Sequence, residues 1–189
     1  MFACVGKRKR RFPFPNPSLS LKEEMTAWAR RSKGKNGDVS IVSLARVMAD
    51  TTHGYEFFEH TADIGIRAEG STLAELFVRM AQGLTSLIAE DSSLQPNASR
   101  SIQLTADSAE ALLLAWLQEL LFWFSTDRFL PVEYQLDEVT PTTLRGQVRG
   151  DTFDPSRHIQ GHEVKAITRH LLEVCERNGS WYGKVIVDI

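Results

Sequence analysis

The last seven residues of the chain, GKVIVDI, place two negative charges side by side at the end of a strand-like segment. Val185, Ile186 and Val187 favour a buried strand, whereas Asp188 is a poor strand former and stands next to the carboxylate of Ile189. Like charges at this spacing repel each other. The arrangement therefore predicts that a cation or a cluster of hydrogen-bond donors lies beside them.

A second group of polar residues precedes another strand-like segment, in the sequence EHTAD. It supplies Glu59, His60 and Asp63, and a neighbouring strand can bring such carboxylates close to Asp188. Ca²⁺ and Mg²⁺ accept several oxygen ligands of this kind, whereas Zn²⁺ prefers more imidazole or thiolate. The residue types thus favour a hard divalent cation. The alternative is that Asp63 caps a turn and Asp188 is a solvated strand end.

Weaker candidates for chemistry lie in the segment RHIQGHEVK. His158 and His162 have the spacing of a helical zinc pair, but Gly161 disfavours the helix that this spacing requires, which predicts two loop histidines instead. Lys165 is either an ordinary lysine at a strand edge or a contact for an anion. The sequence has no P-loop and no G-x-S-x-G nucleophile motif.

Hydrophobic periodicity predicts the elements that position these residues. Thr72 and Glu75 form a capping box at the start of an amphipathic helix whose apolar positions run from Leu73 to Ile88. The dipeptide Asn178-Gly179 between two apolar runs is a strong hairpin signal. The predicted strands are Tyr55–Phe58, Ile64–Ala68, the segment RSIQLTAD that begins at Arg100, Val132–Val139, Thr142–Arg149, Val164–Glu176 and Trp181–Ile189.

A second helix, predicted from Ser108 to about Thr126, has apolar residues around most of its circumference. Asp107 and Glu110 resemble another capping box at its start. Burial under a sheet and against the first helix explains the pattern best; the alternative is an exposed patch of Trp116, Trp123 and Phe124 that meets a partner. Helices between antiparallel hairpins predict an α+β fold, a single compact domain with a mostly antiparallel sheet carrying both helices on one face.

The composition limits the class of protein. A chain of 189 residues, 42% apolar and 24% charged, fits one buried core, and no apolar stretch is long enough to span a membrane. Two cysteines cannot form a disulfide framework or a metal knuckle, and no secretory signal is visible, so we expect a cytoplasmic protein.

Charge divides the chain into two parts. Residues 1–50 carry eleven Lys or Arg against four Asp or Glu, and the remaining residues carry eleven against twenty. We therefore predict that residues 1–52 form a basic, disordered extension and that residues 53–189 form the folded domain. The extension is either a nucleic-acid or targeting tail or a solvated appendage, and the lack of aromatic stacking residues on a folded platform favours the appendage.

Three segments together resemble one known family. YEFFEHTADIGIRAEGSTLAELFVRMAQGL, EVKAITRHLLEV and WYGKVIVDI closely resemble archease, from about Tyr55 to Ile189. The family commonly has Asp where this chain has Glu59 and an aromatic residue where it has Arg169.

The resemblance implies a compact α+β domain and a non-catalytic role in tRNA splicing and RNA repair. It implies an activator of the RtcB-type RNA ligase that promotes guanylylation of the ligase and multiple turnover. GTP would be handled by the partner, and RNA would be contacted only through the ligase. No membrane contact is expected.

The same resemblance implies the residues of a metal site. Its ligands would be Asp63, Asp188 and the carboxylate of Ile189, with Glu59, His60 and Lys165 in a second tier. The cation would be Ca²⁺, with Mg²⁺ or Mn²⁺ as alternatives.

Two other classes of protein remain as alternatives. One is a small metal-dependent phosphohydrolase that uses His60 or His162 as a general base and acts without a partner. The other is a chaperone-like binding module that presents Trp116, Trp123 and Phe124 to other proteins.

Overall fold

The computed structural model describes residues 54–60, 63–90 and 93–189, and the predicted basic extension over residues 1–52 lies outside the described residues. The elements in chain order are β1 (Tyr55–His60), β2 (Asp63–Gly70), α3 (Leu73–Ile88), β3 (Ala98–Thr105), α4 (Ala109–Asp127), β4 (Phe129–Val139), β5 (Thr143–Thr152), β6 (Ala166–Arg177) and β7 (Ser180–Asp188).

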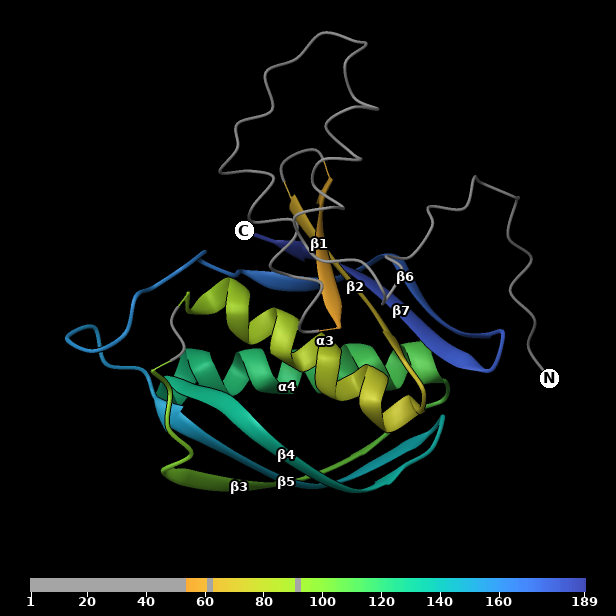
Figure 1. Cartoon of the computed structure of the whole chain (residues 1–189), viewed down its shortest axis with the longest axis horizontal. Helices are drawn as coiled ribbons and strands as arrows, with labels where there is room; N and C mark the ends of the chain where they lie inside the picture. Colours follow the sequence, from red (N-terminus) through yellow and green to blue (C-terminus); the bar gives the residue numbers. More distant parts are fainter. Residues whose placement is uncertain (1–53, 61–62, 91–92) are drawn as a thin grey trace, which may run out of the picture. The chain divides into compact units, whose positions relative to one another are not determined.

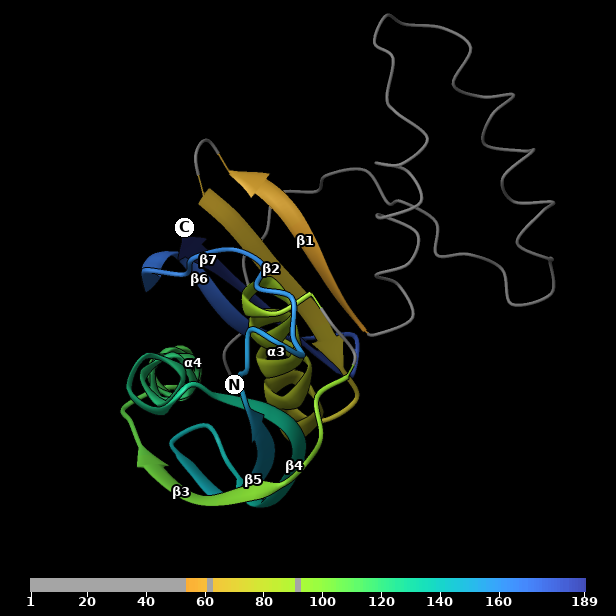
Figure 2. The same ribbon diagram turned by 90° about the vertical axis from the view of Figure 1, so that its left-hand side faces the viewer.

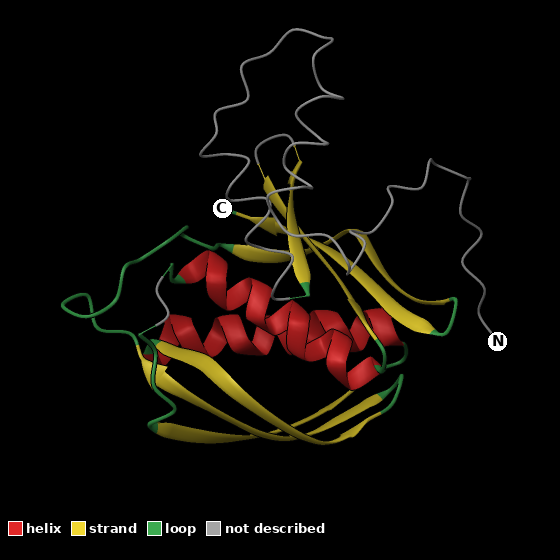
Figure 3. Cartoon of the chain, viewed as in Figure 1, coloured by secondary structure: helices red, strands yellow, loops and turns green. Residues whose placement is uncertain are grey.

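The strands form two antiparallel sheets. One has four strands in the order β1-β2-β7-β6, and the other has three in the order β3-β5-β4. Both helices lie in the layer between the sheets, as Figure 1 and Figure 3 show. The predicted α+β class and antiparallel pairing are confirmed, and each sheet carries the helices on one of its faces.

The first helix begins where the capping box predicted. The Thr72 hydroxyl accepts a hydrogen bond of 3.1 Å from the backbone N–H of Glu75. The Glu75 carboxylate in turn accepts one of 2.6 Å from the N–H of Ser71, which satisfies a second free donor at the helix start. Leu76, Phe77 and other apolar residues of α3 are fully buried against the strands. Capping residues of this kind contribute about 1 kcal/mol to helix stability.

The second helix is the centre of the core. Its N-cap is Ser108, whose hydroxyl accepts from the N–H of Ala111 at 3.2 Å, so the start predicted at Asp107 is off by one residue. Trp116 is fully buried, and its indole Nε1–H donates a hydrogen bond of 3.0 Å to the carbonyl oxygen of Phe77 on α3. Burial between the other elements, the favoured explanation of its apolar circumference, is confirmed.

The hairpin between β6 and β7 has the predicted turn. Asn178 and Gly179 both have positive φ angles, of 53° and 79°, and Arg177 pairs with Ser180 across them. Positive φ at both central residues defines a type I′ turn, whose twist matches that of the flanking strands. This turn fixes the register that brings the end of β7 to its position in the sheet.

Strand β6 contains a large bulge that the sequence analysis did not predict. Thr168 pairs with Ile186 and Glu173 pairs with Lys184, so residues 169–172 of β6 stand opposite Val185 alone. Within the bulge Leu171 has a φ angle of 54°, in the left-handed region that disfavours a branched side chain by about 1–2 kcal/mol. The bulge bends β6 out of regular pairing beside the site described next.

Candidate metal site at the end of the four-stranded sheet

Two of the predicted ligands meet at one end of the four-stranded sheet. Asp63 is the first residue of β2 and Asp188 the last of β7, and these strands pair with Ile64 opposite Val187. The ladder of paired residues ends at this pair, and continuing its register by one residue would place Asp63 opposite Asp188. Facing residues of an antiparallel pair project from the same face, with Cβ atoms about 5 Å apart. Figure 2 shows the start of β2 and the end of β7 at the same end of the sheet.

The third predicted ligand, Ile189, is held beside this pair. The backbone N–H of Lys165 donates to the carbonyl oxygen of Asp188 at 2.9 Å, which extends the β6–β7 pairing by one residue. The Lys165 ammonium donates to an oxygen of Ile189 at 2.8 Å. The Ile189 side chain is partly buried against the core, so hydrogen bonding and packing both restrain this residue.

His60 belongs to the same group. It pairs with Asp63 across the β1–β2 hairpin, and its Nδ1 lies 3.9 Å from an Asp63 carboxylate oxygen. Nδ1 is buried from solvent and has no hydrogen-bond partner among the described residues. A small rotation of either side chain would make His60 a hydrogen-bond donor that orients the Asp63 carboxylate.

Glu59 does not belong to the group. It pairs with Ile64, whereas His60 pairs with Asp63. Because successive residues of a strand project to opposite faces, Glu59 projects from the face of the sheet opposite to Asp63. Of the predicted second-tier residues, Lys165 contacts Ile189 and His60 lies beside Asp63, whereas Glu59 pairs with Ile64.

The donor set fits a cation that prefers oxygen ligands better than it fits zinc. No group of three or more His, Cys, Asp or Glu side chains is arranged to hold a metal within the part of the chain that the structure describes. The candidate set is two aspartates and an oxygen of Ile189, all oxygen donors of the kind that Ca²⁺, Mg²⁺ and Mn²⁺ take. Two facing carboxylates repel each other, and a cation would remove that cost.

The outer face of the sheet next to this site is covered by aromatic and imidazole rings. Phe58 pairs with Gly65 and its ring occupies the space where a Gly65 side chain would lie. Ile186, opposite Gly65 on β7, is almost fully buried although it projects away from the helices. His170 of the bulge packs on His60, with ring centroids 5.2 Å apart. His170 was not predicted as part of this group. The only signal in the sequence is that the two consecutive leucines after it, Leu171 and Leu172, interrupt the alternation of apolar and polar residues expected of a strand.

A separate polar cluster joins the loop after β5 to the segment before β3. Asp151 is buried and accepts hydrogen bonds from the backbone N–H of Gln95 at 3.0 Å and of Thr152 at 2.9 Å, and Arg157 lies 3.6 Å away. Burial raises the pKa of the Asp151 carboxyl, but these hydrogen bonds and the Arg157 charge outweigh it and hold the pKa below its usual value. The Asp151 carboxyl is buried beneath the half-exposed Arg157, and the cluster fits a structural role.

The two histidines of the H-x-x-x-H spacing lie in this loop, as predicted. His158 is buried, with its Nδ1 accepting from the N–H of Asp154 at 3.0 Å and its Nε2 3.6 Å from Asp151. His162 is exposed. The pair therefore does not form a zinc site.

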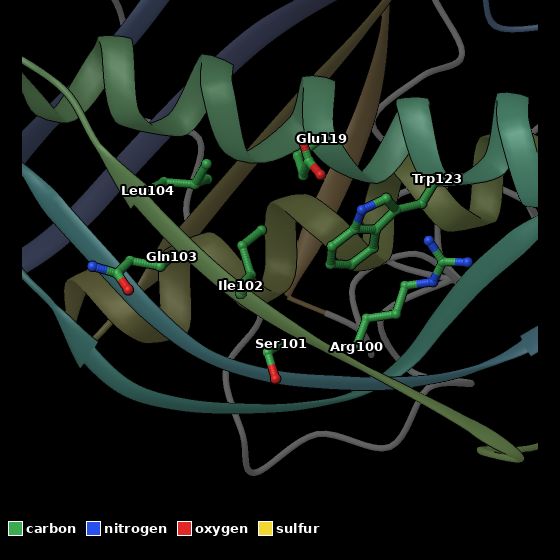
Figure 4. Close-up of a pocket in the computed structure, with 7 residues that line it drawn as sticks. All are labelled: Arg100, Ser101, Ile102, Gln103, Leu104, Glu119 and Trp123. Atoms are coloured by element: carbon green, nitrogen blue, oxygen red, sulfur yellow. The ribbon is translucent and has the colours of Figure 1, made fainter.

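A cavity of about 470 Å³ lies between β3 and α4. None of the candidate metal ligands is among the residues that line it. Figure 4 shows its lining, which consists of Arg100, Ser101, Ile102, Gln103, Leu104, Glu119 and Trp123. The guanidinium of Arg100 already has partners. It forms an ion pair with Asp127 at 2.8 Å and lies 5.5 Å from the centroid of the Trp123 ring. Glu119 is the other charged side chain of the lining.

The aromatic residues considered as a partner-binding patch, Trp116, Trp123 and Phe124, are mostly buried. Trp116 is 0% and Trp123 6% exposed, and Phe124 is only partly exposed. The exposed aromatic residue of α4 is Phe122. Within the described ranges, neither helix combines the length and apolarity that crossing a membrane requires.

Comparison with known proteins identifies the class to which this fold and site belong. The model of the archease protein family matches residues 55–189. The archease of Methanosarcina mazei is 32% identical over 139 residues, which cover 71% of this chain and 95% of that protein. The archease of Sulfurisphaera tokodaii is 35% identical over 130 residues, which cover 68% of this chain and 92% of that protein.

A solved structure agrees with these sequence matches. The solution structure of Methanobacterium thermoautotrophicum protein 1598 superposes with a TM-score of 0.63 at 31% identity, covering 72% of this chain and 99% of that one. The chain belongs to the archease family.

Proposed function

We propose that this protein is a non-catalytic, metal-binding activator of an RtcB-type RNA ligase, acting in tRNA splicing and RNA repair. The observation that carries the proposal is that Asp63 and Asp188 directly adjoin the paired residues Ile64 and Val187 at one end of the sheet, with an oxygen of Ile189 bound by Lys165. Membership of the archease family supports the choice of partner through the resemblance described above. In this role the protein promotes guanylylation of the ligase and its return for further turnovers.

Asp63, Asp188 and an oxygen of Ile189 would hold the divalent cation, with Ca²⁺ the first choice and Mg²⁺ or Mn²⁺ the alternatives. A cation in this position supplies charge neutralisation for nucleotide phosphates, which phosphoryl transfer requires. Lys165 keeps the Ile189 oxygen in place, and His60 is positioned to orient Asp63. None of these residues needs to act as an acid, a base or a nucleophile.

The position of the site suits delivery into a cleft of another protein. The end of β1, the start of β2 and the end of β7 gather at one end of the four-stranded sheet (Figure 2). The residues after position 50 carry twenty acidic against eleven basic side chains. Such a surface is attracted to a basic, RNA-binding protein and repelled by RNA itself.

The test is a multiple-turnover RNA ligation assay with the ligase, GTP and a divalent cation, with and without this protein. Wild type is expected to stimulate turnover, and Asp188→Ala to lose stimulation while keeping its fold. The matched control is Asp137→Ala, because Asp137 is an exposed aspartate on β4 of the other sheet. Stimulation by Asp188→Ala equal to that of wild type would refute the proposal.

Two further arms of the assay test the rival functions and the extension. Phosphoesterase activity of the protein alone would favour a hydrolase, and binding of unfolded clients that ignores EDTA would favour a chaperone-like module. A chain that begins at Met48 should stimulate the ligase as well as the full chain if the basic extension is an appendage.

A further inference from the structure

Three large apolar side chains are strongly exposed within the described part of the chain. Phe122 is 57%, Ile159 61% and Leu171 47% exposed. Phe122 lies on α4 and Ile159 in the loop between β5 and β6. Leu171 alone lies on the four-stranded sheet that carries Asp63 and Asp188.

Leu171 is also the one residue within the described strands of this sheet that has a positive φ angle. Its φ angle of 54° is one that leucine rarely adopts, in contrast to the Asn and Gly that occupy the positive-φ turn between β6 and β7. A leucine that is exposed and has an unfavourable backbone conformation contributes little to folding. Unfavourable conformations of this kind concentrate at functional surfaces.

The bulge that carries Leu171 is anchored on both sides. Before it, the Thr168 hydroxyl donates to the carbonyl oxygen of Ile186 at 3.1 Å. After it, Glu173 forms ion pairs with Arg177 at 2.5 Å and with Lys184 at 3.5 Å. The exposed leucine is therefore presented on a backbone fixed at both ends, so little conformational entropy is lost when a partner covers it.

The bulge lies next to the candidate metal site. His170, the neighbour of Leu171, packs on His60 with ring centroids 5.2 Å apart, and His60 Nδ1 is 3.9 Å from Asp63. Leu171 therefore directly follows, in the chain, a residue that packs beside the side chain next to Asp63. A protein that receives the metal site in a cleft comes close to the bulge.

We infer that Leu171 is an apolar anchor that inserts into a hydrophobic pocket of the partner protein, at the rim of the cleft that receives Asp63 and Asp188. The inference rests on the proposed function, whose partner it shares. A few side chains that fill desolvated pockets of the partner carry most of the binding energy of an interface. Two contacts of different chemistry, one ionic and one apolar, also fix the orientation in which the site enters the cleft.

The test uses the full-length protein, the RtcB-type ligase and Ca²⁺, with affinity measured by titration calorimetry and stability by thermal unfolding. Leu171→Gly and Leu171→Asn both suit a positive φ angle. Both are expected to unfold at or a few degrees above the wild-type temperature, because they relieve the unfavourable leucine conformation, and to bind the ligase about tenfold more weakly. Stimulation at saturating concentration should be retained, because the metal site is intact. The matched controls Phe122→Ser and Ile159→Ser should bind as wild type does.

Wild-type affinity in both Leu171 variants would overturn the inference and leave the proposed function standing. The proposed function fails separately if Asp63→Asn, which keeps Leu171, stimulates the ligase as wild type does. Failure of the wild-type protein to bind the ligase would overturn both.

Discussion

Asp63 and Asp188 stand at the same end of the four-stranded sheet, each one residue beyond the paired Ile64 and Val187. If the register continues by one residue, the two carboxylates repel each other, and the proposed cation would remove this repulsion. The effect on stability can be measured directly.

Replacing Asp63 by Asn should raise the stability of the metal-free protein and abolish the stabilisation by Ca²⁺. In EDTA the variant should be more stable than wild type by about 0.5 kcal/mol, because the cross-strand repulsion is removed. Ca²⁺ should raise the unfolding temperature of wild type and leave that of the variant unchanged. Thermal unfolding with and without Ca²⁺ measures both effects, with Asp137→Asn as the control. An equal Ca²⁺ effect on Asp63→Asn would exclude Asp63 as a ligand.

Removing the Lys165 ammonium should weaken cation binding although it removes a nearby positive charge. The ammonium restrains an oxygen of Ile189 at 2.8 Å, and loss of such an outer contact lowers metal affinity about tenfold. Tb³⁺ luminescence with Ca²⁺ competition on Lys165→Met measures the change. Lys184→Met, which loses the ion pair with Glu173, is the control. Tighter binding by Lys165→Met would mean that charge repulsion outweighs positioning.

Replacing Trp116 by Phe should destabilise the fold without affecting the site. The substitution removes the hydrogen bond to the Phe77 carbonyl and leaves a small void between the helices. A loss of about 2–3 kcal/mol in the free energy of unfolding is expected. Urea unfolding measures it, and Ca²⁺ affinity below the transition should equal that of wild type. A change in that affinity would show that the helices and the site are coupled.

The buried Asp151 predicts a contribution to stability that depends on pH. Its pKa in the folded protein lies below the ordinary value of about 3.9. The ionised form is therefore favoured by folding, so the contribution is complete above about pH 5 and is lost as the pH falls through the folded pKa. Asp151→Asn should lower stability by about 1–3 kcal/mol at pH 7 and show a weaker decrease toward pH 3. Parallel pH profiles of wild type and variant would contradict this assignment.

Local patterns predicted the parts of the fold that local interactions determine. Thr72 caps α3 and Asn178-Gly179 forms the β6–β7 turn as expected, because caps and tight turns depend on residues close in sequence. The arrangement of the strands in two sheets was not predicted. Strand order depends on contacts between distant segments, and alternation alone does not identify the partner of a strand.

Some residues of the candidate site were predicted from the sequence and others were not. The oxygen donors Asp63 and Asp188 were identified from residue type, and their proximity follows from the pairing of β2 with β7. Glu59 was grouped with them because it is near in sequence, although strand alternation separates it from Asp63. The bulge that brings His170 to His60 replaces regular pairing by an irregular backbone, for which the sequence carries no simple pattern.

The pairing of β2 with β7 also has a consequence for biosynthesis. β2 is near the beginning of the folded region and β7 is its last strand, so ribosomes synthesise Asp63 long before Asp188. The pairs between β2 and β7 therefore form only after β7 has been made, and β7 also separates β2 from β6 in the sheet. The four-stranded sheet thus depends on contacts between segments that are far apart in the sequence, and such contacts are slow to form.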